Sequence, residues 1–282
     1  MLASASLTCA AARGCDPGVL NCSAVPATAT PPFAPCTPSL RQWVRSVACA
    51  TDNRRKKKMT FQNKIICGES AKTLASIPNE SIDLIVTDPP YGVNYRDRKG
   101  RKVKNDDDLD FVLPVFTEVF RALKQDSFCI SFYGWNKADI FLTAWKEAGF
   151  SVVGHLVWTK NYASRTGVVK YHHEQAYVLA KGRPARPKQP IADVLQWTAT
   201  GNRAHPTEKA VQSLSPLIGC FSKPGDLVCD PFSGSGSTSV AAALASRNYL
   251  GIELEEKYCA HARKRLAGVA RYMATKDQKL AA

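Results

Sequence analysis

The chain has 282 residues, of which 45% are hydrophobic and 22% charged, values that are ordinary for one or two globular domains. This composition excludes collagen-like, coiled-coil and wholly disordered proteins, and no apolar run approaches the roughly 18 residues of a membrane-spanning helix. We therefore expect no membrane contact. Because 38 Lys and Arg outnumber 24 Asp and Glu, giving a net charge of +14, a polyanion is the first partner to consider.

Residues 1–58 differ in composition from the rest of the chain. They are rich in Ala, Ser, Thr and Pro, show no helical or strand periodicity, and end in a basic run at 54–58. We predict that 1–58 is a disordered or spurious extension, with Met59 as an alternative start, and that the domain spans 59–282. A transit peptide, a nuclear address or a DNA-binding arm stay open as alternatives.

The ten cysteines are scattered without any C-x-x-C spacing, and five of them lie in the first 58 residues. Four of the remaining five lie in or beside apolar segments, where a free cysteine behaves as a small hydrophobic residue. We therefore predict structural thiols and no metal site.

Short apolar runs alternate with helical periodicity from Met59 onward. The predicted strands are 65–67, 82–87, 128–133, 152–158, 176–180, 227–229 and 249–252. The predicted helices are 110–124, 137–149, 208–221, 237–247 and 255–270. This alternation predicts an α/β fold with a doubly wound, mainly parallel seven-stranded sheet and helices on both faces.

Such sheets bind ligands beyond the carboxyl ends of their strands, so the loops after the strands are the candidate sites. The strand at 227–229 is followed by Asp230-Pro231-Phe232-Ser233-Gly234-Ser235-Gly236-Ser237-Thr238. Gly234 and Gly236 would let a ligand approach the backbone at the start of the next helix. The loop matches neither a Walker sequence nor the full dinucleotide fingerprint, and a simple tight turn would also explain it.

The next strand ends at Glu253, whose carboxylate could accept hydrogen bonds from both hydroxyls of a ribose. An ordinary solvated helix start would account for an acidic residue here equally well. Together with the glycine loop before it, Glu253 favours a cofactor that contains a nucleoside.

The loop after the strand at 82–87 is more specific. Asp88-Pro89-Pro90-Tyr91 is a rigid, non-helical turn that presents a carboxylate and an aromatic ring in fixed positions. Such a pair can stack on a planar heterocycle and accept hydrogen bonds from its amino group. A proline turn with a packed tyrosine is the alternative explanation.

These motifs resemble the DNA methyltransferases that methylate the exocyclic amino group of adenine (N6) or cytosine (N4) with S-adenosylmethionine. The resemblance runs from about residue 63 to 266. It includes both loops, His205-Pro206-Thr207-Glu208-Lys209 (with Ala210 where the family usually has proline), Trp158-x-Lys160 and His173-Glu174. Because the catalytic loop precedes the cofactor loop, the chain resembles the circularly permuted beta group.

The resemblance implies the Rossmann-like fold of S-adenosylmethionine methyltransferases, with both loops at one crevice. The implied catalytic residues are Asp88, Pro89, Pro90 and Tyr91. The implied cofactor-binding residues are Glu69, His205, Thr207, Lys209, Asp230, Phe232, Gly234, Gly236, Ser237, Thr238 and Glu253. Glu69 departs from the family, which often has aspartate at this position.

The implied activity is direct methyl transfer to N6 of an adenine flipped out of double-stranded DNA. Asp88 and the Pro89 carbonyl would accept hydrogen bonds from the amino group, and Tyr91 would stack on the base. Adenine is favoured because most adenine enzymes of the family have Asp first in this loop, whereas most cytosine enzymes have Ser. N4 of cytosine is the alternative target.

Two basic segments are candidates for DNA contacts through phosphates. The predicted contacts are Arg96, Arg98, Lys99, Arg101, Lys102 and Lys104 in one segment, and Arg183, Arg186 and Lys188 in the other. The second segment begins a short target-recognition stretch, predicted at 181–204. Solvated loops would also explain both segments.

Other classes of protein are weighed against this one. An RNA or protein methyltransferase of the same fold usually has Asn where this chain has Asp88. A zinc hydrolase would need His at position 177, where Tyr177 stands. A catalytically dead DNA-binding relative would not need the intact loops. The resemblance points to a cytoplasmic enzyme of bacterial, phage or plasmid origin. It leaves open the recognition sequence, a restriction endonuclease partner and whether a homodimer forms.

Overall fold

The computed structural model describes residues 61–93, 100, 106, 108–110, 112, 114–199 and 208–281. All of them lie inside the predicted domain 59–282, whereas the predicted extension 1–58 lies outside the described residues. Within these ranges no helix is both long and apolar enough to cross a membrane.

An eight-stranded sheet organises the described residues, with strand order β1-β10-β9-β2-β3-β7-β4-β8. Its strands are β1 (Lys64–Cys67), β2 (Ile82–Thr87), β3 (Leu123–Phe132), β4 (Ser151–Thr159), β7 (His173–Lys181), β8 (Val194–Gln196), β9 (Leu227–Asp230) and β10 (Asn248–Glu253). The pairs from β1 through β3 are parallel, whereas β7 runs antiparallel to both β3 and β4. The mainly parallel, doubly wound sheet predicted from the sequence is confirmed.

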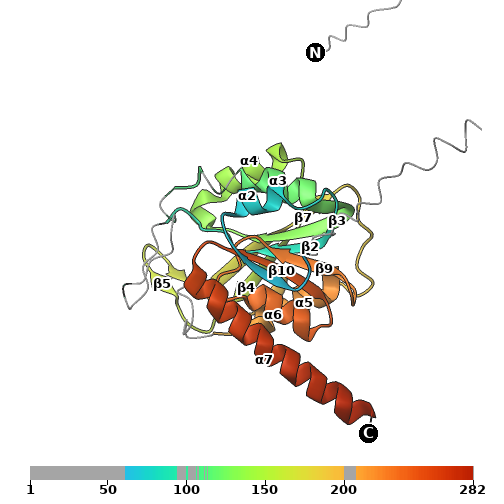
Figure 1. Cartoon of the computed structure of the whole chain (residues 1–282). Helices are drawn as coiled ribbons and strands as arrows, with labels where there is room; N and C mark the ends of the chain where they lie inside the picture. Colours follow the sequence, from blue (N-terminus) through green and yellow to red (C-terminus); the bar gives the residue numbers. More distant parts are fainter. Residues whose placement is uncertain are drawn as a thin grey trace, which may run out of the picture. The chain divides into compact units, whose positions relative to one another are not determined.

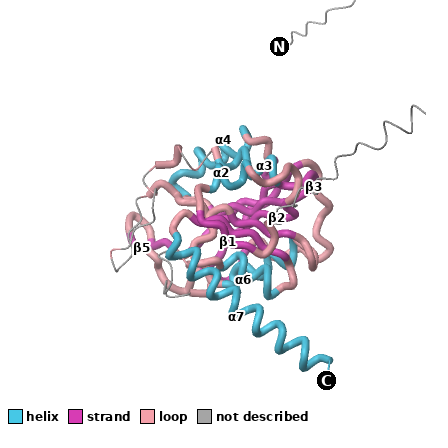
Figure 2. The backbone as a smooth tube through the Cα atoms, in the orientation of Figure 1, coloured by secondary structure: helices cyan, strands magenta, loops and turns pink. Residues whose placement is uncertain are grey.

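Helices cover both faces of the sheet, which forms a central layer in Figures 1 and 2. One face carries α2 (Ser70–Ala75), α3 (Val115–Ala122) and α4 (Ala138–Glu147), and the other carries α5 (Val211–Phe221), α6 (Ser237–Leu244) and α7 (Glu256–Ala281). Alternate residues of β2 pack into different cores: Ile85 faces the cluster under α3 and α4, while Leu84 and Val86 face the cluster under α5 and α6. A strand buried on both faces must be almost entirely apolar, which is why these segments are recognisable in the sequence.

The predicted count of seven strands is short by one. All seven predicted strands are present, and β8 is an additional three-residue edge strand paired with β4. Val194 is exposed and only Leu195 packs against the core, so β8 lacks the continuous apolar run of a central strand. The helix predicted at 110–124 is also shorter, because Leu123 is already extended and pairs with Ile82.

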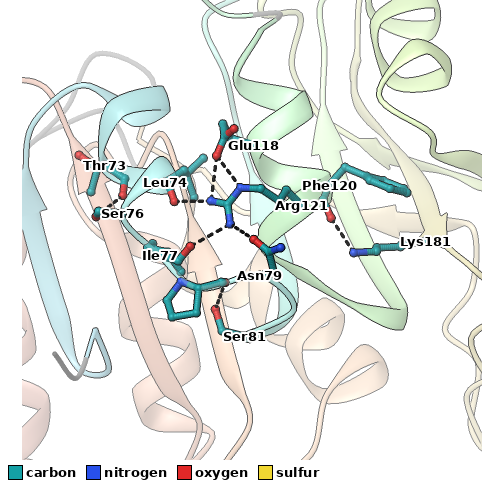
Figure 3. Close-up of polar contacts among 11 residues, drawn as sticks. Thr73, Leu74, Ser76, Ile77, Asn79, Ser81, Glu118, Phe120, Arg121 and Lys181 are labelled. Carbon is teal, nitrogen blue, oxygen red and sulfur yellow. Dashed lines mark hydrogen bonds and ion pairs between the residues drawn. The ribbon is translucent and has the colours of Figure 1, made fainter. Parts of the chain in front are cut away.

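Arg121, near the end of α3, fixes the segment that leads into β2 (Figure 3). Its guanidinium donates hydrogen bonds to the carbonyl of Leu74 at 2.7 Å and to that of Ile77 at 2.9 Å. The same group is paired with Glu118, one turn earlier on α3. One cation thereby ties the end of α2 and the residues after it to α3, although the Leu74 carbonyl also accepts the backbone N–H of Ile77 at 2.8 Å.

The topology brings chain segments that are far apart in sequence to one edge of the sheet. We call the edge where β1, β2, β3, β9 and β10 end the carboxyl edge, and the opposite one the amino edge. Because β2 pairs in parallel with β9, through Leu84 with Val228 and Ile85 with Cys229, the loops that follow these two strands emerge side by side. The order of strands reverses between β2 and β9, so this is the switch point at which such folds bind ligands.

Candidate active site

The Asp88 carboxylate lies at the carboxyl edge and is engaged on both of its oxygens. The Tyr91 hydroxyl donates a hydrogen bond to Oδ1, and Lys209 Nζ lies 2.7 Å from Oδ2. Burial raises the pKa of Asp88, and the charge of Lys209 and these hydrogen bonds lower it only in part. Burial and the neighbouring Asp88 charge raise the pKa of Tyr91 well above its ordinary value, so the phenol stays protonated and donates.

Lys209, predicted to hold the cofactor, is placed by the structure on Asp88. Its ammonium also lies 4.4 Å from the centroid of the Phe132 ring and 5.6 Å from that of Trp197. Burial alone would lower the pKa of Lys209, but the charges of Asp88 and Glu174 raise it, so the side chain remains a cation. The geometry therefore supports a role in holding Asp88, and the predicted cofactor contact stays a prediction.

A second ion pair supports the first. β4 and β7 pair Trp158 with Glu174, and Lys160, the residue after β4, forms an ion pair with the Glu174 carboxylate. The Lys160 ammonium lies 5.4 Å from the centroid of the Trp197 ring, which Lys209 faces as well. The motifs Trp158-x-Lys160 and His173-Glu174 thus lie beside the Asp88 loop, at the carboxyl edge.

Asp106 anchors the Asp88 loop, and sequence reasoning missed it. It is only 4% exposed, and its Oδ1 accepts hydrogen bonds from the backbone N–H of Tyr91 at 2.7 Å and of Gly92 at 3.0 Å. Buried carboxylates are rare unless paired or hydrogen-bonded. The run of three aspartates at 106–108 was the one available signal, but it does not show which of them turns inward.

The glycine loop after β9 is folded around Asp230. This buried carboxylate accepts hydrogen bonds from Thr238 Oγ1 at 2.7 Å and from the N–H of Phe232 at 3.1 Å. Burial raises the pKa of Asp230 to about 7, against the lowering effect of these hydrogen bonds. The carboxylate thus holds the loop to the first turn of α6, where Ser237 begins the helix.

Gly236 is required by the backbone of this loop. Its φ of +80° lies in the left-handed region, and a Cβ placed on it would lie 2.7 Å from the Cβ of Ala262 on α7. Gly234 also has a positive φ, of 51°. The turn therefore needs glycine for its own geometry, whatever a ligand requires in addition.

Glu253, the last residue of β10, is hydrogen-bonded to the glycine loop. Its two carboxylate oxygens accept hydrogen bonds from the N–H of Gly234 at 2.9 Å and the N–H of Glu255 at 2.8 Å. Burial raises its pKa, and these hydrogen bonds counteract that rise. Because each carboxylate oxygen can accept two hydrogen bonds, Glu253 retains acceptor capacity for the hydroxyls of a ribose.

The remaining predicted cofactor residues differ in their placement. Glu69 follows β1 at the carboxyl edge, but its side chain is 44% exposed and lies 2.7 Å from Lys72 Nζ. Its predicted contact with the cofactor stays a prediction. His205 and Thr207 lie outside the described residues.

The predicted DNA contacts are not gathered around Asp88 in the part of the chain that the structure describes. The segment that contains Arg96, Arg98, Lys99, Arg101, Lys102 and Lys104 lies outside the described residues. Arg183, Arg186 and Lys188 follow the end of β7, where Lys181 pairs with Ser127 at the amino edge. Those three residues therefore lie at the edge opposite Asp88, and their contact with DNA stays a prediction.

Cys67, Glu256 and Cys259 place one possible metal-ligand atom each within 4.8 Å of one another. Arg263 Nη1 lies 2.6 Å from the Glu256 carboxylate and already supplies its counter-charge. Burial raises the pKa of both thiols, that of Cys259 to about 12, so both are protonated at neutral pH. The structural role predicted for the cysteines stays a prediction.

A model of the family described as DNA methylase (N6/N4 type) matches residues 82–264. YubD of Escherichia coli (strain K12), provisionally named a methylase, is 52% identical over 211 residues, which cover 75% of this chain and 93% of YubD. The DNA adenine methyltransferase YhdJ of the same strain is 27% identical and is covered over 86% of its length, with 77% of this chain matched.

Solved structures agree with this match. The PvuII DNA methyltransferase, described as cytosine-N4-specific, aligns with a TM-score of 0.60 at 21% identity, over 71% of this chain and 85% of that one. The complex of M1.HpyAVI with S-adenosylmethionine aligns with a TM-score of 0.58 at 22% identity, over 72% and 98%. At these identities the likeness establishes the fold. The fold and the two loops define a Rossmann-like methyltransferase, and the chain belongs to the N6/N4 DNA methylase family.

Proposed function

We propose that this protein transfers the methyl group of S-adenosylmethionine to the N6 amino group of adenine in double-stranded DNA. The observation that carries the proposal is the parallel pairing of β2 with β9, which sets the Asp88 loop beside the glycine loop. Methyl transfer needs a donor and an acceptor held next to each other in one crevice.

The residues on the β9 and β10 side suit the cofactor. The glycine loop gives backbone access at the start of α6, and the partly buried Glu253 carboxylate can accept hydrogen bonds from ribose hydroxyls. The bound sulfonium would supply the methyl group. That M1.HpyAVI was crystallised with S-adenosylmethionine supports the same cofactor for this chain.

The residues on the β2 side suit an amino group. The lone pair of an exocyclic amino nitrogen is delocalised into the ring, and acceptors placed around its hydrogens favour the pyramidal form that can attack. Asp88, fixed between Tyr91 and Lys209, would be one such acceptor and the Pro89 carbonyl the other. Once the base is flipped out of the duplex, the Tyr91 ring would stack on it, an interaction that contributes about 1–3 kcal/mol.

Adenine is the proposed target because of the residue that leads the catalytic loop. Asp-Pro-Pro-Tyr is the sequence that the resemblance associates with adenine enzymes, and the relative YhdJ is named a DNA adenine methyltransferase. The cytosine-N4-specific PvuII enzyme shares the fold, so the target base must be decided by analysis of the product.

The test is to incubate the purified protein with S-adenosylmethionine and unmethylated DNA, digest the DNA, and identify methylated nucleosides by mass spectrometry. We expect N6-methyldeoxyadenosine from the wild type and none from Asp88→Ala. Asp126→Ala, at an aspartate on the amino edge, is the control and should retain activity. N4-methyldeoxycytidine instead would contradict the adenine assignment. The absence of any methylated nucleoside, despite measurable binding of S-adenosylmethionine, would contradict DNA as the substrate.

A further inference from the structure

The connection between β4 and β7 carries a small hairpin away from the sheet. Residues 164–171 contain β5 (Arg165–Thr166) and β6 (Lys170–Tyr171), joined by backbone hydrogen bonds from Ser164 N–H to Tyr171 O and from Gly167 N–H to Val169 O. Figure 1 shows this hairpin, marked by β5, outside the sheet at the periphery of the domain. We call residues 164–171 the β5–β6 hairpin.

The tip of the hairpin is apolar and exposed. The side chains of Val168 and Val169 are 102% and 59% exposed. Single exposed hydrophobic residues are common on protein surfaces. Here two consecutive ones lie at the tip of a hairpin, belong to none of the hydrophobic clusters of the described residues, and form a short apolar wedge.

The base of the hairpin is adjacent to the Asp88 loop. Tyr171 stacks on the exposed Trp135, with ring centroids 5.5 Å apart and an interplanar angle of 24°. The residue before Trp135 is Gly134, where an added Cβ would lie only 3.0 Å from the Cβ of Tyr91. Continuous contacts therefore connect the hairpin to the loop proposed to hold the target base.

The same connection has the charge that a polyanion requires. Residues 160–173 contain Lys160, Arg165 and Lys170 together with two histidines, and no Asp or Glu. Lys160 is neutralised by Glu174, but Lys170 is exposed beside the valines. An apolar tip next to an exposed cation complements duplex DNA, whose phosphates are anionic and whose stacked bases are apolar.

We propose that the β5–β6 hairpin inserts Val168 and Val169 into the duplex beside the target base and occupies the space that the flipped base leaves. This inference rests on the proposed function. Lys170 would bind a neighbouring phosphate. Apolar side chains inserted at base steps offset part of the cost of unstacking, so the wedge acts on base flipping rather than on methyl transfer itself.

The test compares two short duplexes that contain one site methylated by the wild type. In the first the target base is normally paired, and in the second it lies opposite an abasic position. The second duplex has already lost the pair that flipping must break. We expect the double variant Val168→Ser, Val169→Ser to lose about tenfold in kcat/KM on the paired duplex and to match the wild type on the abasic one.

Val153→Ser is the matched control, because Val153 is 54% exposed but lies in β4 at the amino edge. It should behave as wild type on both duplexes. An unchanged double variant on the paired duplex, an equal loss on both duplexes, or a change in oligomeric state would overturn the inference. If the wild type itself methylates no DNA, the proposed function fails, and that result is distinguishable from a failure of the hairpin alone.

Discussion

Three side chains, two of them from distant parts of the sequence, determine the chemistry of the Asp88 carboxylate. Tyr91 donates to it from the same loop, Lys209 pairs with it from the segment before α5, and Glu174 acts on it through its charge from β7. The sequence motifs identify these residues as functional but do not show their partners. Lys209 was therefore predicted at the cofactor, since its motif precedes the cofactor loop.

The pH dependence of methyl transfer tests the role of Lys209. As an acceptor Asp88 must be ionised, so activity should fall as pH drops through its pKa, which Lys209 lowers. In Lys209→Met that pKa rises, and the acidic limb of the kcat profile should move to higher pH. At a pH below the pKa, each unit by which the pKa of Asp88 rises lowers its ionised fraction about tenfold. Lys209→Arg keeps the charge and should keep the wild-type limb, whereas a simple loss of kcat with an unmoved limb would argue against this role.

Asp230 should make the stability of the protein depend on pH. Its pKa is about 7 in the folded protein, compared with an ordinary value of 3.8. Because the pKa of Asp230 is higher in the folded protein, its contribution to the free energy of unfolding is fully present below about pH 4. That contribution, about 4 kcal/mol at most, is lost as pH rises through 7. Asp230→Asn removes this titration, so the difference in free energy of unfolding between variant and wild type should change over that interval. Urea unfolding at several pH values measures it, and a constant difference would contradict the burial argument.

At the scale of elements, periodicity predicted the buried strands well and the boundaries poorly. A strand covered on both faces leaves a continuous apolar run, as in β2 and β9, whereas the edge strand β8 leaves none. The apolar stripe of α3 continues to Leu123, but the backbone there is extended, because it pairs with β2. Pairing between strands overrides local periodicity, and such pairing cannot be read from one segment alone.

Gly236 links the cofactor loop to α7 and gives a prediction at this scale. Gly236→Ala forces a side chain into a left-handed backbone and against Ala262, which should destabilise the fold by about 1–3 kcal/mol and weaken cofactor binding. Gly268→Ala is the control. Gly268 lies on α7, as Ala262 does, and a Cβ added there would have no atom of the described residues within 4 Å. Gly268→Ala should stabilise the helix by about 0.5–1 kcal/mol. Urea unfolding of both variants measures these changes. Equal changes in the free energy of unfolding would contradict a special requirement for glycine at position 236.

For the whole molecule, the decisive feature is that residues 88 and 230 lie at the ends of adjacent strands although 142 positions separate them in sequence. The resemblance to a permuted family predicted this adjacency, since these two strands lie side by side in the family's fold. It could not predict that Asp106 anchors the Asp88 loop, nor that the basic stretch after β7 lies at the amino edge. Both depend on where the chain turns between elements, which local sequence patterns do not determine.

In the proposed function the site has two separable halves, with Glu253 serving the cofactor and Asp88 the target base. Calorimetry of S-adenosylmethionine binding to Asp88→Ala and Glu253→Gln distinguishes the two halves. We expect Asp88→Ala to bind the cofactor as tightly as wild type although it transfers no methyl group. Glu253→Gln should bind about tenfold more weakly, as expected when a charged acceptor is lost. Lost binding in Asp88→Ala, or wild-type binding in Glu253→Gln, would show that the two halves are not separable in this way.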